Sequence, residues 1–412
     1  MNIWAIFLFS PRKYKGLDML AGKKLLVQGA GRGNLGLMQT AKRHGVFTIV
    51  TGMGGDYPCN PLADKLRYAD ISDPDVVLSI AREEKIDGIV ICCSDTGLRA
   101  VGRCNDVLEL SGITEEAACF SSDKLLMKKR LVEYGVRTAR FLEIRNSADI
   151  RRAVDLLSFP MILKATDLQG SRGITIVNDL QELGIAFEDT MLLTKKDYCI
   201  VEEFIIGKEF GAQAFVYQGD VLFVLPHGDE TFLGKTAVPI GHFMPLSLSD
   251  KLIRDVEYQA KTAIKALGLN NCAVNIDFIE KDGRTYIIEL TGRVGANCLP
   301  ELVSNFLGID YYEMILRTVM GESPLPVLND RKNSCCTLSR MVKSTMSGII
   351  DTLILPDKIS GELHMFVRPG NEVRAFTNCN DAIGEVIVAG GTLDECNVKA
   401  QEIISGIKIN MK

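Results

Sequence analysis

Residues 273–295 read AVNIDFIEKDGRTYIIELTGRVG, and the interpretation of the chain begins from this stretch. Two apolar runs rich in β-forming residues flank the turn sequence Lys-Asp-Gly at 281–283, so the segment predicts a β-hairpin. Asp277 lies in the first run and Glu289 in the second. We therefore expect the hairpin to bring two carboxylates close together from within apolar strands.

Carboxylates in such a setting are costly unless a cation or hydrogen bonds compensate them. Hard oxygen ligands of this kind suit magnesium that is held jointly by protein and nucleotide phosphates. Asn275 shares a strand face with Asp277, because side chains alternate along a strand with period two, so it is also expected to line the site. The alternative interpretation is a solvated hairpin face on which the two acids are incidental.

The composition is that of an ordinary globular protein and excludes one class of partner. The chain has 412 residues, which suits two to three domains, and 47% of them are hydrophobic. A net charge of −5 provides none of the basic surface that nucleic-acid binding requires, so we expect no nucleic-acid partner.

The cysteines and histidines form no recognisable metal motif. Twelve cysteines are scattered without a C-x-x-C spacing, which is typical of reduced core cysteines in a cytosolic protein rather than of disulfides or a zinc site. The four histidines show no clustered spacing, which argues against a transition-metal centre. We therefore expect a cytoplasmic protein without such a centre.

The N-terminal sequence MNIWAIFLFSPRKYKG begins with a short apolar run that basic residues follow. A signal peptide would place the positive charge first, and a membrane span needs about 20 apolar residues, which no segment supplies. We interpret residues 1–20 as an extension that docks on the protein's own surface, with weak membrane contact as the alternative.

From Lys23 onward the chain alternates strands with helical segments. KKLLVQGAGRGNLG leads into the helical LMQTAKRHG, and the apolar strands FTIVTG and DGIVICC follow. This alternation predicts a parallel α/β sheet, which we place at residues 21–120.

A glycine-rich turn after the first strand raises the alternative of NAD binding. An NAD site usually places an acid at the end of the second strand to hold the ribose, whereas the nearest acid here, Asp56, lies beyond that strand. Any tight βα turn prefers glycine, so an NAD oxidoreductase is the less favoured alternative. The glycines concerned are Gly29, Gly31, Gly33 and Gly36.

A second candidate feature is a small-residue loop between two apolar runs, in FPMILKATDLQGSRGITIV. Lys164 ends the first run and supplies a positive charge, while the loop residues Gly170, Ser171, Arg172 and Gly173 follow. Glycines let backbone N–H groups approach phosphate oxygens, and a serine adds a donor. The alternative is an exposed hairpin loop with ordinary surface charge.

Taken in chain order, these features resemble the ATP-grasp superfamily. The ordered set consists of Lys124, Lys164, the GSRG loop, VEEFIIGKE at residues 201–209, Asp277, and Glu289 with Arg293 four residues later. The resemblance covers nearly the whole chain and is strongest to the amino-acid ligases and to the biotin-carboxylase and carbamoyl-phosphate-synthase type. Alone, VEEFIIGKE would be interpreted as an edge strand with a turn at Gly207.

The resemblance implies a role for each residue of the set. Lys124 and Lys164 would neutralise the phosphates of ATP, and Gly170, Ser171, Arg172 and Gly173 would close over them. Glu202 and the backbone of Glu203 and Ile205 would hold the adenine, and Glu209 the ribose. Asp277 and Glu289 would bind Mg²⁺, for which Mn²⁺ could substitute, and Arg293 would stabilise charge on the phosphate or the acyl phosphate.

The sequence departs from the superfamily pattern at one position. Many members carry Asn two residues after the glutamate, where this chain has Thr291. A hydroxyl is a shorter ligand with a single oxygen, so the number of magnesium ions, one or two, is left open.

The resemblance implies an ATP-dependent carboxylate–amine ligase that forms an amide or peptide bond through an acyl phosphate and releases ADP and phosphate. The candidate substrate contacts lie in loops or beside the hairpin and are His227, Lys235, His242, Asn275 and Asn297. Carboxylation with bicarbonate through carboxyphosphate is the nearest alternative, and a nucleotide-binding module without catalysis is a more distant one.

The expected fold class is α/β and α+β, and the expected partners are a small carboxylate and a small amine. A homodimer is a common assembly for soluble enzymes, although the sequence does not determine it. The expected organisation is an N-terminal extension (1–20), a Rossmann-like α/β domain (21–120), an ATP-grasp small subdomain (121–195), a nucleotide- and metal-binding subdomain (196–328) and a mixed C-terminal domain (329–412).

Overall fold

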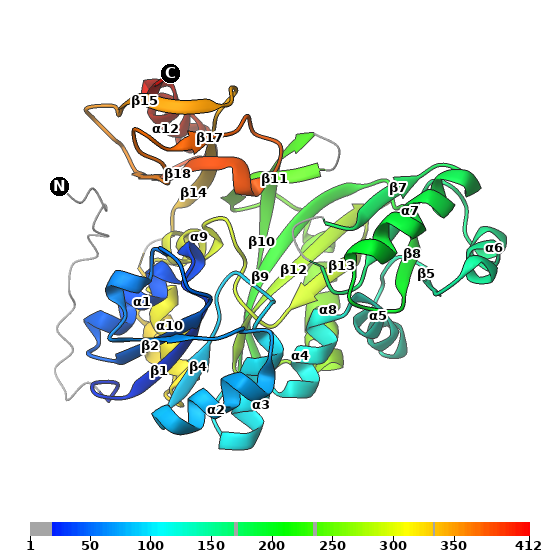
Figure 1. The fold of residues 1–412 in the computed structure, drawn as a ribbon, viewed down its shortest axis with the longest axis horizontal. Helices are drawn as coiled ribbons and strands as arrows, with labels where there is room; N and C mark the ends of the chain where they lie inside the picture. The colour runs from blue at the N-terminus through cyan, green and yellow to red at the C-terminus, as the bar shows by residue number, and fades with distance from the viewer. Residues whose placement is uncertain (1–18, 169–171, 234–236, 333) are drawn as a thin grey trace.

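The protein is described by a computed structural model that covers residues 19–168, 172–233, 237–332 and 334–412. In Figure 1 an N-terminal α/β layer, drawn in blue, lies beside a long sheet, and a C-terminal layer, drawn in orange, contains the last strands of that sheet at one of its ends. A small subdomain, drawn in green, lies at the other end of that sheet. The chain thus surrounds a central sheet with three smaller bodies.

The N-terminal layer is a parallel sheet, as the alternation of strands and helices predicts. Its strands are β1 (Lys24–Gln28), β2 (Phe47–Gly52), β3 (Lys65–Tyr68) and β4 (Gly88–Val90), in the order β3-β2-β1-β4. The helices α1 (Leu35–Arg43), α2 (Pro74–Glu84) and α3 (Leu98–Leu108) belong to this layer, with the short 3₁₀ helices η1 (Arg32–Asn34) and η2 (Asn60–Leu62). Because the strands are parallel, the loops that follow β1 and β4 lie at the same edge.

A second, antiparallel sheet forms the small subdomain. Its strands are β5 (Phe141–Ile144), β6 (Met161–Ala165), β7 (Ile174–Val177) and β8 (Cys199–Glu203), in the order β5-β8-β6-β7, with helices α6 (Ser147–Leu156) and α7 (Leu180–Leu193) packed on it. Helices α4 (Glu115–Ser122) and α5 (Lys124–Glu133) lead into it. Asp123 caps α5 by accepting hydrogen bonds from the N–H groups of Leu125 and Leu126, which fixes where Lys124 begins the helix.

The long central sheet has eight strands in the order β13-β12-β9-β10-β11-β14-β18-β16. These are β9 (Lys208–Tyr217), β10 (Asp220–Leu233), β11 (Ala237–Met244), β12 (Cys272–Lys281), β13 (Arg284–Thr291), β14 (Cys336–Lys343), β16 (Glu362–Met365) and β18 (Ala382–Gly390). Helix α8 (Asp250–Leu267) packs its buried side against β13 and β10. The sheet therefore runs without interruption from the acidic hairpin to the C-terminal layer.

The remaining elements complete the N-terminal and C-terminal layers. Helices α9 (Leu299–Leu307), α10 (Tyr311–Val319) and α11 (Leu325–Asn329) follow the hairpin, and α10 packs against α1. The C-terminal layer adds β15 (Gly348–Ile354), β17 (Glu372–Val373) and β19 (Lys408–Met411), in the order β17-β15-β19, together with η3 (Cys379–Asp381) and α12 (Leu393–Gly406).

Glycines in the first turn are required by packing. A Cβ at Gly36 would lie 2.2 Å from the Tyr312 ring, and one at Gly33 would lie 2.6 Å from the Cβ of Cys93. Gly29 has a φ of +84°, a conformation that side-chain-bearing residues rarely adopt. These contacts account for three of the four glycines without a dinucleotide, so they give the NAD alternative no support.

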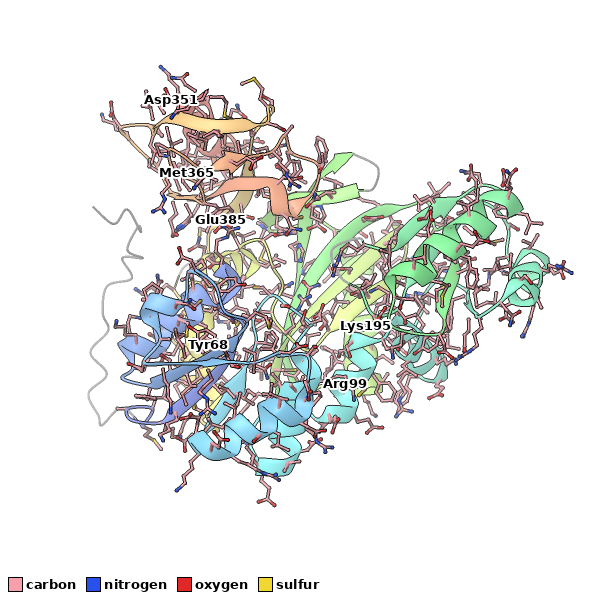
Figure 2. The ribbon with its side chains drawn as sticks, in the orientation of Figure 1. Tyr68, Arg99, Lys195, Asp351, Met365 and Glu385 are labelled. Carbon is pink, nitrogen blue, oxygen red and sulfur yellow. The ribbon has the colours of Figure 1, made fainter. Side chains whose placement is uncertain are left out.

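The C-terminal layer contacts the edge of the parallel sheet that carries this turn. The guanidinium carbon of Arg32 lies 3.3 Å from the centre of the Phe366 ring. Burial lowers the pKa of Arg32, and the nearby carboxylate of Glu385 opposes that shift. Glu385, labelled in Figure 2, lies on the side of the C-terminal layer that faces the N-terminal layer.

The expected class, α/β and α+β with a parallel N-terminal sheet and antiparallel sheets beyond it, is confirmed. The domain boundaries stay a prediction, and residues 1–18 of the proposed extension lie outside the described part of the chain. Among the helices that the structure describes, none has the length and apolar character needed to cross a membrane.

Candidate active site

The acidic hairpin is present, and its two acids face one another. Asp282 and Gly283 connect β12 to β13 with φ values of +53° and +70°, as a two-residue type I′ turn requires. Asp277 pairs directly with Glu289 in the antiparallel register. Residues so placed have Cβ atoms about 4.5–5.5 Å apart, so the two carboxylates reach the same space.

The electrostatics of this pair favour a cation. The side chain of Asp277 is accessible to solvent. Even so, partial loss of hydration among the surrounding protein atoms raises the pKa of Asp277 to about 7, and repulsion from the Glu289 carboxylate contributes to the shift. Asn275 lies on the same strand face, as expected, and its Nδ2 donates to Oδ1 of Asp277 at 3.1 Å. A divalent cation between the carboxylates would relieve their repulsion, and these hard oxygens fit magnesium.

Arg293 is held by an acid that the sequence did not reveal. Its Nε donates to Oδ1 of Asp95 at 2.7 Å, and its Nη2 donates to Oδ2 at 3.0 Å. The hydroxyl of Thr291 donates to the same Oδ1 at 2.9 Å, so Thr291 is engaged with Asp95. Although burial acts to raise the pKa of Asp95, Arg293 lowers it below the ordinary value, and the pair is therefore ionic.

The predicted lysines and acids form one charged cluster between the small subdomain and the hairpin. Lys164 Nζ donates to Oε2 of Glu202 at 3.1 Å, and Lys128 Nζ lies 3.1 Å from the same oxygen. Lys124 Nζ lies 3.3 Å from Oε2 of Glu289. Lys128, which is fully buried, was not among the predicted site residues.

Glu202 retains an acceptor that fits the predicted ligand. Burial acts to raise its pKa, but Lys128 and Lys164 lower it, so the group is a carboxylate. Its Oε1 is buried and has no hydrogen-bond partner among the described residues. A buried acceptor without a donor is costly, and the exocyclic amino group of adenine would satisfy it.

Residues 201–209 cross from the small subdomain to the long sheet, where an adenine-binding hinge is predicted. Glu203 ends β8, and its carboxylate accepts a hydrogen bond from Arg140 Nε at 2.8 Å. Ile205 lies between β8 and β9, and Glu209 is exposed near the start of β9. The roles of these residues stay predictions.

Part of the predicted phosphate loop lies outside the described residues. Gly170 and Ser171 fall there, as does the substrate candidate Lys235. Arg172 is exposed, and Gly173 has a φ of +64° and accepts a hydrogen bond from Ala165 N at 2.8 Å. The described end of the loop is thus hydrogen-bonded to β6.

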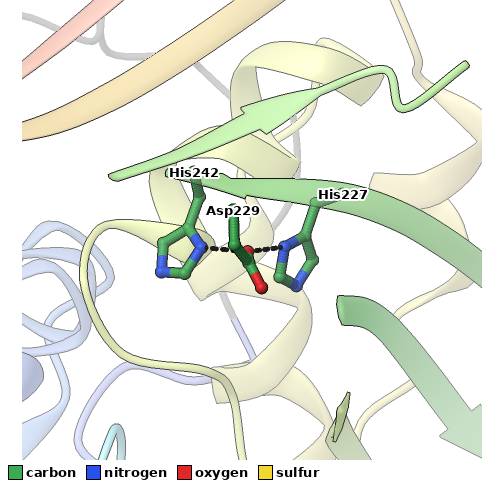
Figure 3. A group of neighbouring side chains, drawn as sticks. All are labelled: His227, Asp229 and His242. Atoms are coloured by element: carbon green, nitrogen blue, oxygen red, sulfur yellow. Dashed lines mark hydrogen bonds and ion pairs between the residues drawn. The ribbon is translucent and has the colours of Figure 1, made fainter. Parts of the chain in front are cut away.

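Two candidate substrate residues, His227 and His242, meet at Asp229. Their Nδ1 atoms lie 2.9 Å and 2.6 Å from Oδ1 of Asp229 (Figure 3). Ligand-type atoms of all three side chains lie within 4.8 Å of one another. The two histidines lie apart along the chain and come together in the fold, because the pairing of β10 with β11 sets Asp229 opposite His242.

A buried glutamine connects this cluster to the acidic hairpin. Gln213 Nε2 donates to Oδ1 of Asn275 at 2.6 Å and lies 3.5 Å from Nε2 of His227. Gly295 N donates to Oε1 of Gln213 at 3.1 Å, and a Cβ at Gly295 would lie 2.5 Å from Oδ1 of Asn275. Asn297 has a φ of +55°, and its carbonyl accepts from Ser339 Oγ at 3.2 Å, while its contact with substrate stays a prediction.

Four residues of this site were missed in the sequence, although each had a local signal. Lys128 is one helical turn after Lys124, and Asp229 is two strand positions after His227, so both pairs share a face. Asp95 follows the strand DGIV at the carboxyl edge of a parallel sheet. Gln213 alternates with apolar residues of β9 and had the weakest signal.

Residues 157–301 match the family described as the ATP-grasp domain. The crystal structure of phosphoribosylglycinamide synthetase from Anaerococcus prevotii is 47% identical, covers 95% of this chain and 100% of its own, and superposes with a TM-score of 0.83. The crystal structure of L-amino acid ligase from Bacillus licheniformis covers 95% of this chain and 99% of its own with a TM-score of 0.80. At 19% identity, that likeness concerns the fold.

Among curated proteins, the carbamoyl phosphate synthase large chain of Clostridium beijerinckii is 23% identical over 331 residues. The match covers 75% of this chain but only 30% of that relative. The chain therefore spans less than a third of the length of that relative.

Proposed function

This chain belongs to the ATP-grasp family, and on that premise we propose that it is a carboxylate–amine ligase that activates an amino acid as an acyl phosphate and releases ADP and phosphate. The observation that carries the proposal is the pair Asp277 and Glu289, which face one another beside the ion-paired Arg293. A module that only bound nucleotide would have little need of all three groups.

The nucleotide would lie between the small subdomain and the hairpin. Glu202 Oε1 supplies the unsatisfied acceptor for adenine, and Lys124 and Lys164 bring cations to the phosphates. Asp277 and Glu289 would hold Mg²⁺ or Mn²⁺, which would neutralise charge on the transferring phosphoryl group.

Two bond exchanges make up the proposed reaction. A substrate carboxylate oxygen attacks the γ-phosphorus, and the bond to the β-phosphate breaks, so ADP leaves. The amine nitrogen then attacks the carbonyl carbon, and the C–O bond to phosphate breaks. Arg293, which is ion-paired with Asp95, would stabilise the oxyanion that develops at the carbonyl or phosphoryl oxygen.

The first substrates to test are glycine and phosphoribosylamine. They follow from the name of the Anaerococcus prevotii protein, a phosphoribosylglycinamide synthetase, which is 47% identical to this chain. Arg32 lies at the carboxyl edge of the parallel sheet, beside Phe366, where a phosphate on the amine substrate would meet a cation. An L-amino acid as the amine, which would give a dipeptide, is the second pairing to test.

The nucleotide product tests the mechanism. Purified protein is incubated with ATP, Mg²⁺, glycine and phosphoribosylamine formed in situ from ribose 5-phosphate and ammonia, with Asp277→Asn as the control for contaminating ATPases. We expect ADP and phosphate, and glycine hydroxamate when hydroxylamine replaces the amine. AMP would contradict the acyl-phosphate route, because an adenylating ligase attacks the α-phosphorus.

Two further outcomes would select the alternatives. ADP release that depends strictly on bicarbonate would indicate carboxylation through carboxyphosphate. Nucleotide binding without turnover on any amino acid would indicate a non-catalytic module. Size-exclusion chromatography with light scattering tests whether the protein forms a homodimer.

A further inference from the structure

Three polar side chains on two neighbouring strands form a hydrogen-bonded group. His227 and Asp229 are two residues apart on β10 and therefore share a face, and His242 on β11 pairs with Asp229. Figure 3 shows both imidazoles directed at the carboxylate from opposite sides. His227 and His242 are buried, with 2% and 5% of their surfaces exposed, so this is an interior group and not a surface cluster.

The hydrogen bonds assign the proton on His227. Gln213 Oε1 accepts from the backbone N–H of Gly295, so its Nε2 is the donor that faces Nε2 of His227. His227 must then accept at Nε2, which leaves its proton on Nδ1, donated to Asp229. Burial lowers the pKa of His227, in agreement with a neutral ring.

The same reasoning places the proton of His242 on Nδ1 as well. Asp229 is a carboxylate and can only accept, so His242 donates to it from Nδ1. Burial acts to raise the pKa of Asp229, but the hydrogen bonds from His227 and then His242 lower it below its ordinary value. The second ring nitrogen of His242, Nε2, therefore carries a lone pair. The hydrogen bond from Nδ1 to the carboxylate of Asp229 fixes the orientation of this ring.

The Nε2 atoms of the two imidazoles differ in what surrounds them. A proton on Nε2 of His227 would face the amide N–H of Gln213, donor against donor. His242 has no such opposition from Gln213, and the charge of Asp229 would stabilise the imidazolium that forms. Asp229 thus directs the basicity of the group to Nε2 of His242.

The group also lies next to the proposed reaction centre. From His227 a chain of contacts runs through Gln213 and Asn275 to Oδ1 of Asp277. Asp229 is itself among the charges that act on the pKa of Asp277. The histidine–aspartate group is thus connected to a residue that would hold the metal in the proposed reaction centre.

A resident metal ion accounts for this geometry less well. If both rings bound a metal through Nδ1, their protons would lie on Nε2. The N–H at Nε2 of His227 would then face the amide N–H of Gln213, which places two donors against each other. Both Nδ1 atoms instead approach a single oxygen at hydrogen-bond distance.

We propose that Nε2 of His242 is the general base that removes the proton from the attacking amine, and that Asp229 positions it. This inference rests on the proposed carboxylate–amine ligase activity. As the nitrogen bonds to the carbonyl carbon, one N–H proton passes to His242. The electron pair of the breaking C–O bond leaves with phosphate, which then takes that proton, so His242 is restored.

The test separates activation of the carboxylate from attack by the amine. His242→Asn keeps a donor toward Asp229 but lacks the basic nitrogen, Asp229→Asn removes the orienting charge, and His364→Asn is the matched histidine control. Each variant is assayed for glycine hydroxamate with hydroxylamine, which attacks acyl phosphates without a protein base, and for amide formation with phosphoribosylamine.

We expect His242→Asn to reduce amide formation by about 10²–10⁴-fold, the usual contribution of a general base, with hydroxamate formation unchanged. Asp229→Asn should show the same selective loss to a smaller degree, and the control neither. Equal loss of both products in both variants would overturn the base assignment, as would amide formation at the wild-type rate.

Two further results would count against a general base at His242. A wild-type protein that makes no hydroxamate from any amino acid would refute the proposed function itself, and the base assignment with it. Stoichiometric zinc or another transition metal in the purified wild type, lost in Asp229→Asn, would overturn the base assignment alone and make the group a metal site.

Discussion

Asp95 and Arg293 form a two-point ion pair that joins the N-terminal parallel sheet to the acidic hairpin. The distances are 2.7 Å from Nε to Oδ1 and 3.0 Å from Nη2 to Oδ2. A bidentate pair fixes the guanidinium in orientation as well as in position. Any catalytic work that Arg293 performs therefore depends on a residue from a different layer of the fold.

Asp95→Asn should lower both stability and turnover. The two side chains are only 10% and 13% exposed, and breaking one side of a buried pair costs about 3–5 kcal/mol. We expect the free energy of unfolding to fall by about 3 kcal/mol, at the low end of that range, because Asn retains one hydrogen-bond acceptor for Arg293. We also expect kcat to fall by about 10–100-fold, because Arg293 loses its fixed orientation. Urea unfolding and steady-state kinetics measure the two effects.

The matched control for that variant is Asp75→Asn, which removes an exposed partner of Arg103 in the same layer. It should change the free energy of unfolding by about 1 kcal/mol or less. An Asp95→Asn protein as active as the wild type would show that Arg293 needs no anchor.

Asp277→Ala and Glu289→Ala should each abolish turnover and leave the fold intact. Loss of a metal ligand would remove several kcal/mol of transition-state stabilisation, which corresponds to roughly three orders of magnitude in rate. Magnesium titrations of ADP release report the effect, and circular dichroism checks the fold. Glu257→Ala, on the exposed side of α8, is the control acid, and near-normal turnover in either hairpin variant would remove the metal site from the proposal.

Lys164→Ala should weaken ATP binding more than Lys164→Arg. Loss of a charge-assisted hydrogen bond is worth about 1.5–3 kcal/mol, so we expect roughly a 10- to 100-fold rise in Kd for the alanine variant. Isothermal titration calorimetry gives the affinities, with Lys129→Ala, an exposed lysine of α5, as the control. Unchanged affinity in Lys164→Ala would refute the phosphate role of this lysine.

Glu209→Ala should mainly raise the apparent KM for ATP. A ribose contact stabilises the ground state and the transition state alike, so kcat should change little. Initial rates over a range of ATP concentrations measure both constants. A fall in kcat at unchanged KM would assign Glu209 to the chemistry instead of to the ribose.

Glu301→Gln should stabilise the protein at alkaline pH. Burial raises the pKa of Glu301 to about 7 from its ordinary 4.5, against the hydrogen bond that Tyr312 Oη donates at 2.6 Å. Between these two pKa values the folded protein holds a proton that the unfolded chain has lost, so stability falls as the pH rises from about 4.5 to about 7. Above that range the penalty is constant.

Thermal unfolding at pH 4.5 and pH 8 measures this effect. The glutamine variant, which keeps an acceptor for Tyr312, should have a higher Tm than the wild type at pH 8 and the same Tm at pH 4.5. Glu257→Gln should show no such pH-dependent difference. Equal stabilisation by Glu301→Gln at both pH values would show that improved packing, and not titration, is responsible.

The hairpin illustrates what local sequence can predict. Alternation of apolar residues and the turn at Asp282 and Gly283 predicted the hairpin of β12 and β13 and the proximity of its two acids. Their direct opposition was not predictable, because the register set by this turn would pair Asp277 with Ile288, and a β-bulge between Asp277 and Phe278 sets Asp277 opposite Glu289 instead. Helix α5 was predictable for the same kind of reason, because its cap at Asp123 lies next to the residues that it satisfies.

The partners of these residues were not predictable. Asp95 is 198 positions from Arg293, and nothing near either residue specifies the other. The pairing of β10 with β11 brings Asp229 to His242, and the packing of three layers brings Lys124 to Glu289. Such contacts depend on how whole sheets are placed, and only tertiary packing determines that.

The sequence by itself therefore determined the elements, the hairpin that carries the two acids and the order of the candidate ATP-binding residues, because these depend on spacings within single strands, turns and loops. Tertiary structure alone decided which charges neutralise one another, which carbonyl or carboxylate orients each donor, and which imidazole nitrogen keeps its lone pair. Those properties arise from burial and from distances between segments remote in the chain, and burial is a property of the folded molecule, not of any local stretch of its sequence.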